Sequence, residues 1–262
     1  MSFSKKVVLI TGASSGIGAG AAIHLAELGA KVSIVGRNEK RLNEVAEEIK
    51  SAGSPAPLLI VADVTKDAKR IVNETIKKFG QLDVLVNNAG FAKPDSVSTA
   101  NLSQFDSIFD TNIRSVITLT KLCVPHLEKT KGNVVNISSV AGLKATPNFL
   151  SYCMSKAALD QFTKCSALDL APKGIRVNSV NPAAIRTGFI EVCMGAQKED
   201  ATKMYDGIGS IYPVGRVGEV ADTSAAIAFL ADDKTASFLT GILLPVDGGS
   251  LVAGTNSASK LR

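Results

Sequence analysis

The sequence contains few of the residue types that bind transition metals or form structural disulfides. Among its 262 residues there is no tryptophan, and there are only two histidines and four cysteines. Zinc and iron sites usually combine closely spaced cysteine and histidine ligands. His24 and His126 lie far apart in the chain, and no CxxC pair occurs. We therefore expect no metal site, and we interpret the cysteines as free thiols of a reducing compartment.

Long apolar runs are also absent from the sequence. A membrane-spanning helix needs about 18 consecutive apolar residues, and no stretch approaches that length. The first residues, MSFSKKVVLITG, lack the apolar core of a signal peptide. The tail reads SASKLR, and the tripeptide SKL is a peroxisomal signal only at the very end of a chain, whereas Arg262 follows it here. We expect a cytoplasmic protein without a membrane span.

Basic residues exceed acidic ones, yet they form no patch in the sequence. The net charge is +5 and the pI is about 9.0, but no run of five or more basic residues occurs. Chains that bind nucleic acid usually gather such residues in one segment or on one face. We therefore expect no nucleic-acid partner, and we expect a few placed cations to serve an anionic cofactor.

Short apolar runs alternate with longer amphipathic segments along the chain. The apolar runs are rich in β-branched residues and lie at 7–10, 32–35, 58–61, 84–86, 133–137, 175–180 and 242–246. Such continuous runs are typical of strands buried on both faces of a parallel sheet. Helical periodicity marks 39–50, 66–79, 102–129, 151–171 and 217–231. The alternation predicts one α/β domain over 1–262, a doubly wound seven-stranded parallel sheet of the Rossmann type.

The segment 188–215 carries the least pattern and mixes apolar residues with glycine. Because it lies between two predicted strands, we expect a mobile substrate lid there. A long surface insertion is the alternative.

A glycine motif directly follows the first predicted strand. The residues TGASSGIG at 11–18 place Gly12, Gly16 and Gly18 between a strand and a helix. Glycine lets the backbone turn tightly beside a pyrophosphate, and the free N–H groups of the helix point at it. This order predicts a dinucleotide-binding site.

The end of the second predicted strand distinguishes the two nicotinamide nucleotides. Proteins that bind NAD usually place an acidic residue there, on the ribose 2′-hydroxyl. This chain has Gly36 in that place, and Arg37 follows it. A cation without a carboxylate suits a 2′-phosphate, although Arg37 could also be a solvated residue at the start of the next helix. We predict NADP(H) in preference to NAD(H).

The stretch SSVAGLKATPNFLSYCMSK at 138–156 contains a candidate device for proton transfer. If Tyr152 and Lys156 lie on a helix, their spacing places them one turn apart on the same face. An ammonium group beside a phenol lowers the pKa of the phenol, so Tyr152 could exchange protons near neutral pH. Ser138 and Ser139 precede this pair. Taken singly, a serine pair after a strand is more often a turn or a helix cap, and a tyrosine and a lysine at helical spacing are commonly surface residues that pack together.

These motifs together resemble the short-chain dehydrogenase/reductase family, and the resemblance extends almost end to end. It includes TGASSGIG, NNAG at 87–90, YxxxK at 152–156, NP at 181–182 with Thr187, and VDGG at 246–249. The resemblance implies four catalytic residues, namely Asn112, Ser139, Tyr152 and Lys156. The family's spacing of thirteen residues to the tyrosine selects Ser139, and Ser138 would then support the turn.

The glycine motif and the resemblance together imply a set of cofactor contacts. These residues are Gly12, Ser14, Ser15, Gly16, Ile17, Gly18, Arg37, Asn38, Asp63, Val64, Asn88, Ala89, Gly90, Tyr152, Lys156, Pro182, Ile185 and Thr187. Asp63 matches the position that contacts the adenine amine. One departure is Ala183, which stands where the family usually has glycine, and its methyl group should narrow or shift the turn beside the nicotinamide.

The resemblance implies an NADP(H)-dependent oxidoreductase that interconverts a ketone or aldehyde and an alcohol by hydride transfer. Tyr152 would act as the acid or base, and Lys156 would lower its pKa and hold the nicotinamide ribose. Ser139 would bind the substrate oxygen, and Asn112 would keep a helix kinked around a water. The alternatives are an NAD-dependent alcohol dehydrogenase of the same family, or a nucleotide-binding regulatory protein with little turnover.

The predicted substrate pocket is mostly apolar. Its main residues are Ser139, Ala141, Leu143, Phe149, Tyr152 and Phe189, and further wall candidates are Phe91, Ala92, Lys93, Cys153, Ile185 and Met194. We expect Lys93 to reach solvent, and no arginine is placed to bind a carboxylate. This favours a neutral hydrophobic substrate such as a steroid, retinoid, isoprenoid or xenobiotic carbonyl.

The two long helical segments carry more small and apolar residues than one sheet face needs. These are Val116, Leu119, Ala157, Ala158, Ala167 and Leu168. Together with the family resemblance, they predict a homotetramer or a dimer.

Overall fold

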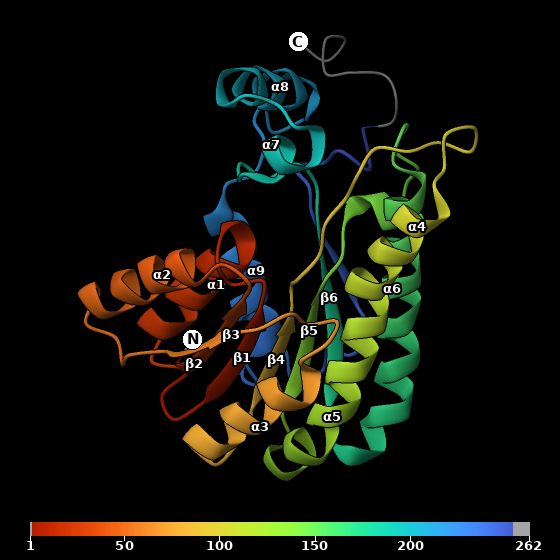
Figure 1. The fold of residues 1–262 in the computed structure, drawn as a ribbon. Coiled ribbons are helices and arrows are strands. Elements are labelled where there is room, and N and C mark those ends of the chain that lie inside the picture. The colour runs from red at the N-terminus through yellow and green to blue at the C-terminus, as the bar shows by residue number, and fades with distance from the viewer. Residues whose placement is uncertain (1, 254–262) are drawn as a thin grey trace.

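The seven predicted strands form a single parallel sheet in a computed structural model, which describes residues 2–253 (Figure 1). The strands are β1 (Val7–Thr11), β2 (Lys31–Gly36), β3 (Leu58–Val61), β4 (Val84–Asn87), β5 (Asn133–Ile137), β6 (Arg176–Pro182) and β7 (Leu243–Val246). They lie in the order β3-β2-β1-β4-β5-β6-β7, and every neighbouring pair is parallel. The predicted fold class, a doubly wound Rossmann sheet in one domain, is therefore confirmed.

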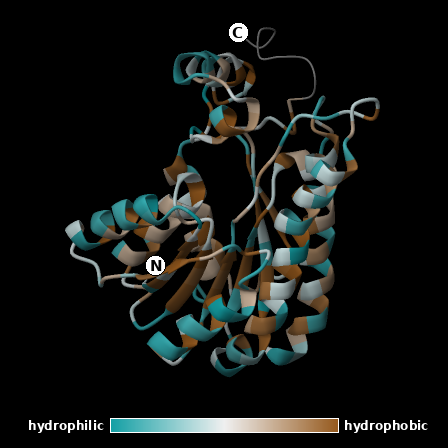
Figure 2. Cartoon of the chain, in the orientation of Figure 1, coloured by the Kyte–Doolittle hydropathy of each residue, from teal (hydrophilic) through white to brown (hydrophobic). Residues whose placement is uncertain are grey.

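Helices cover both faces of this sheet. One face packs against α1 (Gly16–Glu27), α2 (Glu39–Ser51) and α9 (Val220–Ala231), and the other against α3 (Ala68–Phe79), α5 (Ser115–Thr130) and α6 (Leu150–Leu170). Within β1, Val8 and Ile10 belong to the first core, whereas Val7 and Leu9 belong to the second. Because successive strand residues point to opposite faces, a doubly covered strand must be apolar throughout. Figure 2 shows the strands as a hydrophobic layer between amphipathic helices.

The predicted helix 102–129 contains a widened turn. The structure divides it into α4 (Leu102–Phe109), a π turn η1 (Asp110–Arg114) and α5. The residues at both joints keep right-handed helical dihedral angles, so the helix continues through the wider turn. Single π turns inside α-helices often occur at functional sites. This one contains Asn112, which is only 1% exposed.

The segment 188–215 is more ordered than its pattern predicts, because it contains α7 (Phe189–Met194) and α8 (Lys198–Ile211). Glycines within and between these helices weaken the helical periodicity of the sequence. Both helices stand beyond the carboxyl edge of the sheet (Figure 1). The Tyr205 hydroxyl donates to the Thr187 carbonyl oxygen at 2.8 Å, and Arg186 pairs with Asp206 at 2.8 Å. These contacts attach α8 to the chain that leaves β6.

The strand order creates a crevice between β1 and β4. From β1 the chain first moves outward to β2 and β3, and then returns to β4 on the other side of β1. In doubly wound sheets, ligands bind at the carboxyl ends of the strands where the order reverses in this way. The fold therefore places the glycine motif after β1 and the NNAG residues after β4 at one position.

A buried amide pair supports the sheet just below this crevice. Asn87 and Asn136 are register partners on β4 and β5, and Asn87 Nδ2 donates to Asn136 Oδ1 at 2.9 Å. Asn87 Nδ2 also donates to Thr120 Oγ1 on α5 at 3.1 Å, and Asn136 Nδ2 donates to Thr163 Oγ1 on α6 at 2.9 Å. The pair thus joins two strands to the two helices that cover them.

Two further expectations concern a membrane span and the C-terminal tail. Among residues 2–253, no helix combines the length and the apolar character needed to cross a bilayer. The SASKLR tail lies outside the described residues.

Replacing Asn87 by alanine should destabilise the fold. The substitution leaves Asn136 Oδ1 and Thr120 Oγ1 without their partner and opens a small cavity, which together cost about 2–4 kcal/mol of the free energy of unfolding. Urea unfolding followed by circular dichroism measures this loss. Asn43→Ala on the exposed face of α2 removes the same side chain from water and is the control. Equal losses in the two variants would show that the buried pair contributes nothing.

Candidate active site

The glycine motif forms a tight turn between β1 and α1. Gly12 and Gly16 adopt φ angles of 65° and 56°, which side chains other than glycine rarely tolerate. Gly18 has a different reason, because a Cβ atom there would collide with Asn88 Nδ2 and the Gly12 carbonyl oxygen. The first two glycines therefore shape the turn, and the third allows α1 to approach the loop that follows β4.

The first turn of α1 is suited to binding an anion. Within the described part of the chain, no side chain caps this helix at Ser15, and its first turn holds no acidic residue. Its leading N–H groups are therefore available to a phosphate, whose charge the helix dipole also favours. Thr187 lies against the same turn, since a Cβ atom on Gly16 would sit 3.3 Å from Thr187 Cγ2. These features fit the pyrophosphate of a dinucleotide.

Asn88, which directly follows β4, holds this turn in place through hydrogen bonds. Its Nδ2 donates to the carbonyl oxygens of Thr11 at 2.8 Å and Gly12 at 3.1 Å. The backbone N–H groups of Asn88 and Ala89 both donate to Thr11 Oγ1 at 3.0 Å. Both hydrogens of the Asn88 amide are therefore used by the protein, so its side chain shapes the cofactor turn from within.

The ends of β2 and β3 form the other end of the predicted cofactor site. A Cβ atom on Gly36 would lie 3.1 Å from Ser14 Oγ, so this position has little room for a carboxylate side chain. Arg37 is exposed, and the side chain of Asn38 caps α2 by accepting from Arg41 N at 3.0 Å. A cation thus stands at the end of β2 with its head group in solvent.

The Asp63 carboxyl lies near this cation. Burial raises its pKa, but hydrogen bonds from Thr65 and the charges of Arg37 and Lys66 outweigh burial, and the pKa lies below its ordinary value. Asp63 Oδ1 accepts from Thr65 N at 2.9 Å and from Thr65 Oγ1 at 2.7 Å. The carboxylate is therefore ionised and fixed in direction at neutral pH, as a hydrogen-bond acceptor for an amine should be.

The helix α6 begins with a cap supplied by another segment. Its own N-cap residue, Phe149, provides no side-chain hydrogen bond. Asp95, in the loop after β4, accepts instead from Ser151 N at 3.1 Å and from the Ser151 hydroxyl. Sequence reasoning missed Asp95, because only the fold brings this loop to the start of α6. The cap immediately precedes Tyr152 and so holds the start of the helix that carries it.

Tyr152 and Lys156 lie together on α6, as their spacing predicts. The Lys156 Nζ atom is 5.6 Å from the centre of the Tyr152 ring and donates to the Ile137 carbonyl oxygen at 2.8 Å. The Lys156 side chain is buried, with 4% exposure. Gly90 faces this group, because a Cβ atom there would lie 3.6 Å from Lys156 Nζ. The ammonium group therefore lies between the end of β5 and the NNAG loop.

Asn112 joins the π turn to α6 and to Phe91, which directly follows the NNAG loop. Its Nδ2 donates to Ser155 Oγ on α6 at 3.0 Å and to the Phe91 carbonyl oxygen at 3.0 Å. Its Oδ1 accepts from Phe91 N at 3.1 Å. The helix widens at Asn112, and three hydrogen bonds to Phe91 and Ser155 fix the side chain of this asparagine.

The two serines point in different directions. Ser138 Oγ donates to the Lys156 carbonyl oxygen at 3.2 Å and supports the packing of α6 on β5. Ser139 Oγ accepts from Ala141 N at 3.1 Å, and it donates to the Pro182 carbonyl oxygen over a long 3.4 Å. It also lies close enough to Tyr152 to lower the pKa of the phenol. Ser139 therefore shares a site with the phenol, whereas Ser138 does not.

The pKa values correct one expectation. Burial raises the pKa of Tyr152 to about 12, against the opposing hydrogen bond with Ser139. Burial lowers the pKa of Lys156 to about 8, against the opposing charge of Asp160. The prediction that Lys156 brings the phenol pKa near neutrality does not hold in this structure, because the ammonium is directed at Ile137 O and the raising effect of burial outweighs the lowering effects on the phenol. At neutral pH, Tyr152 is a proton donor.

Apolar side chains surround this phenol. The Phe149 and Phe189 rings lie 6.4 and 6.0 Å from the Tyr152 ring, centre to centre. Leu143 and Met194 are large apolar residues that remain exposed, at 42% and 46%. Ala141, Ala92 and Ile185 are buried behind the surface, and Phe91 and Cys153 are half-buried.

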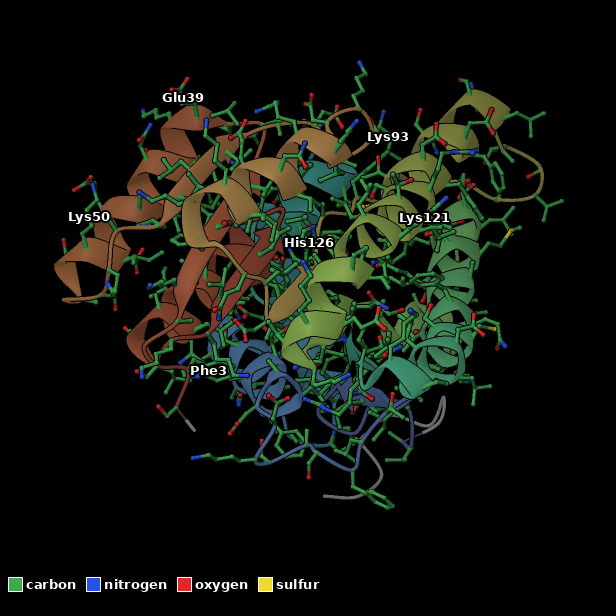
Figure 3. All side chains as sticks on the ribbon, turned by 90° about the horizontal axis from the view of Figure 1, so that it is seen from below. Phe3, Glu39, Lys50, Lys93, Lys121 and His126 are labelled. Atoms are coloured by element: carbon green, nitrogen blue, oxygen red, sulfur yellow. The ribbon has the colours of Figure 1, made fainter. Side chains whose placement is uncertain are left out.

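The sequence singles out Lys93 and Ala183 for different reasons. Lys93 is exposed, as expected, and is labelled in Figure 3, which also labels Glu39 and Lys50 at the two ends of α2. Ala183 donates its N–H to the Val246 carbonyl oxygen at 3.0 Å and does not adopt a positive φ. Its backbone conformation therefore does not require glycine.

The fold and the clustered residues define a doubly wound α/β protein with a dinucleotide-type turn beside a serine, a tyrosine and a lysine. Comparison with known proteins identifies its family. A family model described as "Enoyl-(Acyl carrier protein) reductase" matches residues 12–250. The chain belongs to the short-chain dehydrogenase/reductase family, and it is an oxidoreductase of a family that uses nicotinamide nucleotides.

Individual relatives cover nearly the whole chain. The L-fucose dehydrogenase of Bos taurus is 37% identical over 95% of this chain and 90% of its own. A short-chain dehydrogenase/reductase of unknown function from Caenorhabditis elegans, solved with cofactor, superposes with a TM-score of 0.91 at 41% identity, covering 95% of this chain and 96% of its own. The glucose dehydrogenase of Caenorhabditis elegans in its apo form gives a TM-score of 0.82 at 44% identity, covering 96% and 100%.

Proposed function

We propose that the protein is an NADP(H)-dependent oxidoreductase that interconverts a ketone or aldehyde and an alcohol, with Tyr152 as the acid or base. The observation that carries this proposal is the meeting of Ser139, Tyr152 and Lys156 at the crevice that also holds the glycine turn. A regulatory protein with little turnover has no physical need for a buried lysine beside a phenol, and burying the lysine is costly.

The residues divide the work of the reaction. A bound nicotinamide supplies or accepts the hydride at the substrate carbon. In reduction, Ser139 Oγ turns from its long contact with Pro182 O and donates to the substrate carbonyl, which orients it and stabilises developing charge. Tyr152 then gives its phenolic proton to the same oxygen as the alcohol forms. In oxidation, the phenolate takes that proton back.

Lys156 and Asn112 support this proton transfer. The ammonium compensates the negative charge left on the phenolate, and its buried position strengthens that attraction. Facing Gly90, it would also hold the nicotinamide ribose. Asn112 keeps the helix open at its π turn and holds Phe91 and Ser155, so that a water can connect Lys156 to solvent.

NADP(H) is favoured over NAD(H) by the end of β2. Gly36 leaves no carboxylate to repel a phosphate, and Arg37 is exposed beside it. The charge of Arg37 already acts on Asp63, at the end of the site where an adenosine would bind. Arg37 therefore supplies the positive charge that a 2′-phosphate requires.

Two neutral substrate classes are supported by different observations. The rings of Phe149 and Phe189 around the phenol favour a hydrophobic carbonyl such as a steroid, retinoid, isoprenoid or xenobiotic. The relatives named for L-fucose and glucose favour a hexose. We give priority to the hydrophobic carbonyl because most wall candidates, including Leu143, Phe149 and Phe189, have apolar side chains. The helices α7 and α8 would close over the substrate as a lid.

We further propose a cytoplasmic homotetramer or dimer. Leu168 on α6 and Ile117 on α5 are 78% and 45% exposed, whereas Val116 and Ala167 pack against the sheet. The outward apolar residues would be covered by a second chain. All four cysteines are free thiols, as a reducing compartment allows.

Replacing Tyr152 by phenylalanine should abolish turnover. We expect a loss of at least about 1000-fold in kcat for NADPH oxidation, because no other group can donate the proton. NADPH binding should change little, since the aromatic ring stays. The assay uses a panel of hydrophobic ketones, and NADP⁺ with L-fucose and glucose in the reverse direction. Equal rates in the two proteins, or no rate with any substrate despite NADPH binding, would refute the proposed chemistry.

Reduction and oxidation should respond differently to pH. Because burial raises the pKa of Tyr152 to about 12, the phenol stays protonated through the neutral range and the reduction rate should be nearly flat there. Oxidation needs the phenolate, so its rate should rise about tenfold for each pH unit across the neutral range, below the Lys156 pKa of about 8. Steady-state rates over a pH series measure both limbs. A plateau of the oxidation rate near neutral pH would contradict this assignment.

Replacing Arg37 by alanine should weaken NADPH binding selectively. Loss of a charge-assisted contact with a 2′-phosphate corresponds to about 10–100-fold in Kd, and NADH binding should be almost unchanged. Fluorescence titration of both nucleotides measures the ratio. Lys50→Ala at the far end of α2, the helix that follows Arg37, also removes one positive charge and is the control. An unchanged ratio of the two Kd values would show that Arg37 does not bind the phosphate.

A further inference from the structure

A buried carboxyl group lies directly beneath the proton-transfer pair. Asp160 is on α6, one helical turn after Lys156, and its side chain is 4% exposed. Carboxylates are almost never buried to this degree unless another group compensates their charge. The proton-transfer roles described above do not use Asp160.

The hydrogen bonds of Asp160 lead to the catalytic serine. Its Oδ1 accepts from Asn181 Nδ2 at 2.9 Å. The same Asn181 amide donates to the Ser139 carbonyl oxygen at 3.1 Å, and Ser179 Oγ donates to Asn181 Oδ1 at 2.8 Å. Asp160 therefore holds the amide that connects the ends of β5 and β6.

The second oxygen of Asp160 has no such partner. Among the described residues, no hydrogen-bond partner of Asp160 Oδ2 meets normal geometric limits. The space above it is closed by Gly142, since a Cβ atom there would collide with Oδ2 and lie 2.8 Å from the Lys156 carbonyl carbon. Water has little access here, so the charge of Asp160 is compensated by the Ser138 hydroxyl and Asn181, which lower its pKa, and by charges that act through space.

Two cations act on this carboxyl group. Lys156 and Lys164 lie one turn before it and one turn after it on α6, and the charge of each lowers the pKa of Asp160. Lys164 is exposed, so water screens it, whereas Lys156 is buried. Charges interact more strongly where the surroundings exclude water. The main compensating charge for Asp160 is therefore the ammonium group of Lys156, and the relation is mutual.

We propose that Asp160 is a positioning residue that keeps Lys156 in its ammonium form and, through Asn181, holds the backbone of Ser139 in place. This inference rests on the proposed function, because it gives Asp160 its purpose through Tyr152 and Lys156. Each buried group opposes the other's loss of charge. Without the carboxylate, Lys156 would lose its proton more readily and would compensate the phenolate less.

The pKa values agree in direction with this arrangement. Burial lowers the pKa of Lys156 to about 8, and the charge of Asp160 opposes this. Burial raises the pKa of Asp160, and the hydrogen bonds and Lys156 oppose that shift. A lysine that titrates just above neutral pH is sensitive to one additional charge, since a small shift changes its ammonium fraction greatly.

The test measures the titration of Lys156 without substrate or nucleotide. Protein labelled with ¹³C at the lysine Cε carbons is titrated by NMR, and Lys156→Arg assigns the signal. In Asp160→Asn, which keeps an oxygen to accept from Asn181, the Lys156 midpoint should fall by ~1 pH unit. Asp169→Asn, an exposed carboxyl group on the same helix, is the control and should leave the midpoint unchanged.

A reciprocal measurement covers the case in which Asp160→Asn does not fold. By linkage, removing the ammonium must raise the Asp160 pKa by the amount that removing the carboxylate lowers the Lys156 pKa. We expect the Asp160 ¹³Cγ midpoint in Lys156→Gln to rise by ~1 pH unit. An unchanged midpoint in either variant would overturn the proposal.

Kinetics separate this proposal from the proposed function. If the wild-type protein turns over, the reduction rate of Asp160→Asn should begin to fall at a lower pH than the wild-type rate, or should fall across the neutral range. NADPH binding and the pH profile of Asp169→Asn should stay as in the wild type. A wild-type protein without turnover would refute the proposed function, yet the two NMR titrations would still decide whether Asp160 controls Lys156.

Discussion

The Thr11 hydroxyl connects the ends of β1 and β4 at the point where the strand order reverses. It accepts from the backbone N–H groups of Asn88 and Ala89, both at 3.0 Å. The side chain of Asn88 returns the contact by donating to the carbonyl oxygens of Thr11 and Gly12. Without this reciprocal set, the glycine turn and the NNAG loop would be two independent loops. With it, they form one rigid edge to the crevice.

The remaining site is assembled around that edge by buried polar contacts. Asp95 caps α6 from the loop after β4, and Asn112 ties the same loop to α6 through Ser155. On the far side, Asn181 links the Ser139 backbone to Asp160. A buried polar group without a partner is costly, so such contacts specify one arrangement of the helix relative to the sheet. The helix α6 is therefore held at both its first and its third turn.

Burial also decides the electrostatics of the site. A phenol and an ammonium in water would titrate near their ordinary values, but here burial moves the pKa of Tyr152 up to about 12 and that of Lys156 down to about 8. The two shifts narrow the choice of role for each group. The Tyr152 phenol is protonated at neutral pH, and the pKa of Lys156 becomes responsive to neighbouring charges such as that of Asp160.

Much of the fold was predictable because its signals are local. Continuous apolar runs predicted all seven strands, since a strand covered on both faces must be apolar at every position. The helices α7 and α8 were missed because glycines interrupt their pattern. The π turn at Asn112 was expected only as a kink, because a single widened turn leaves no mark in periodicity.

The sequence by itself determined the parallel sheet, the glycine turn, the one-turn spacing of Tyr152 and Lys156, and the family to which they belong. Each of these depends on residues that are near one another in the chain or on a pattern with a fixed period. Only the tertiary structure decided that Asp95 caps α6, that the Asn88 amide donates to the glycine turn, and that Asp160 lies buried one helical turn after Lys156. Those facts depend on which distant segments meet and on how completely they exclude water, and neither is a property of a short stretch of sequence.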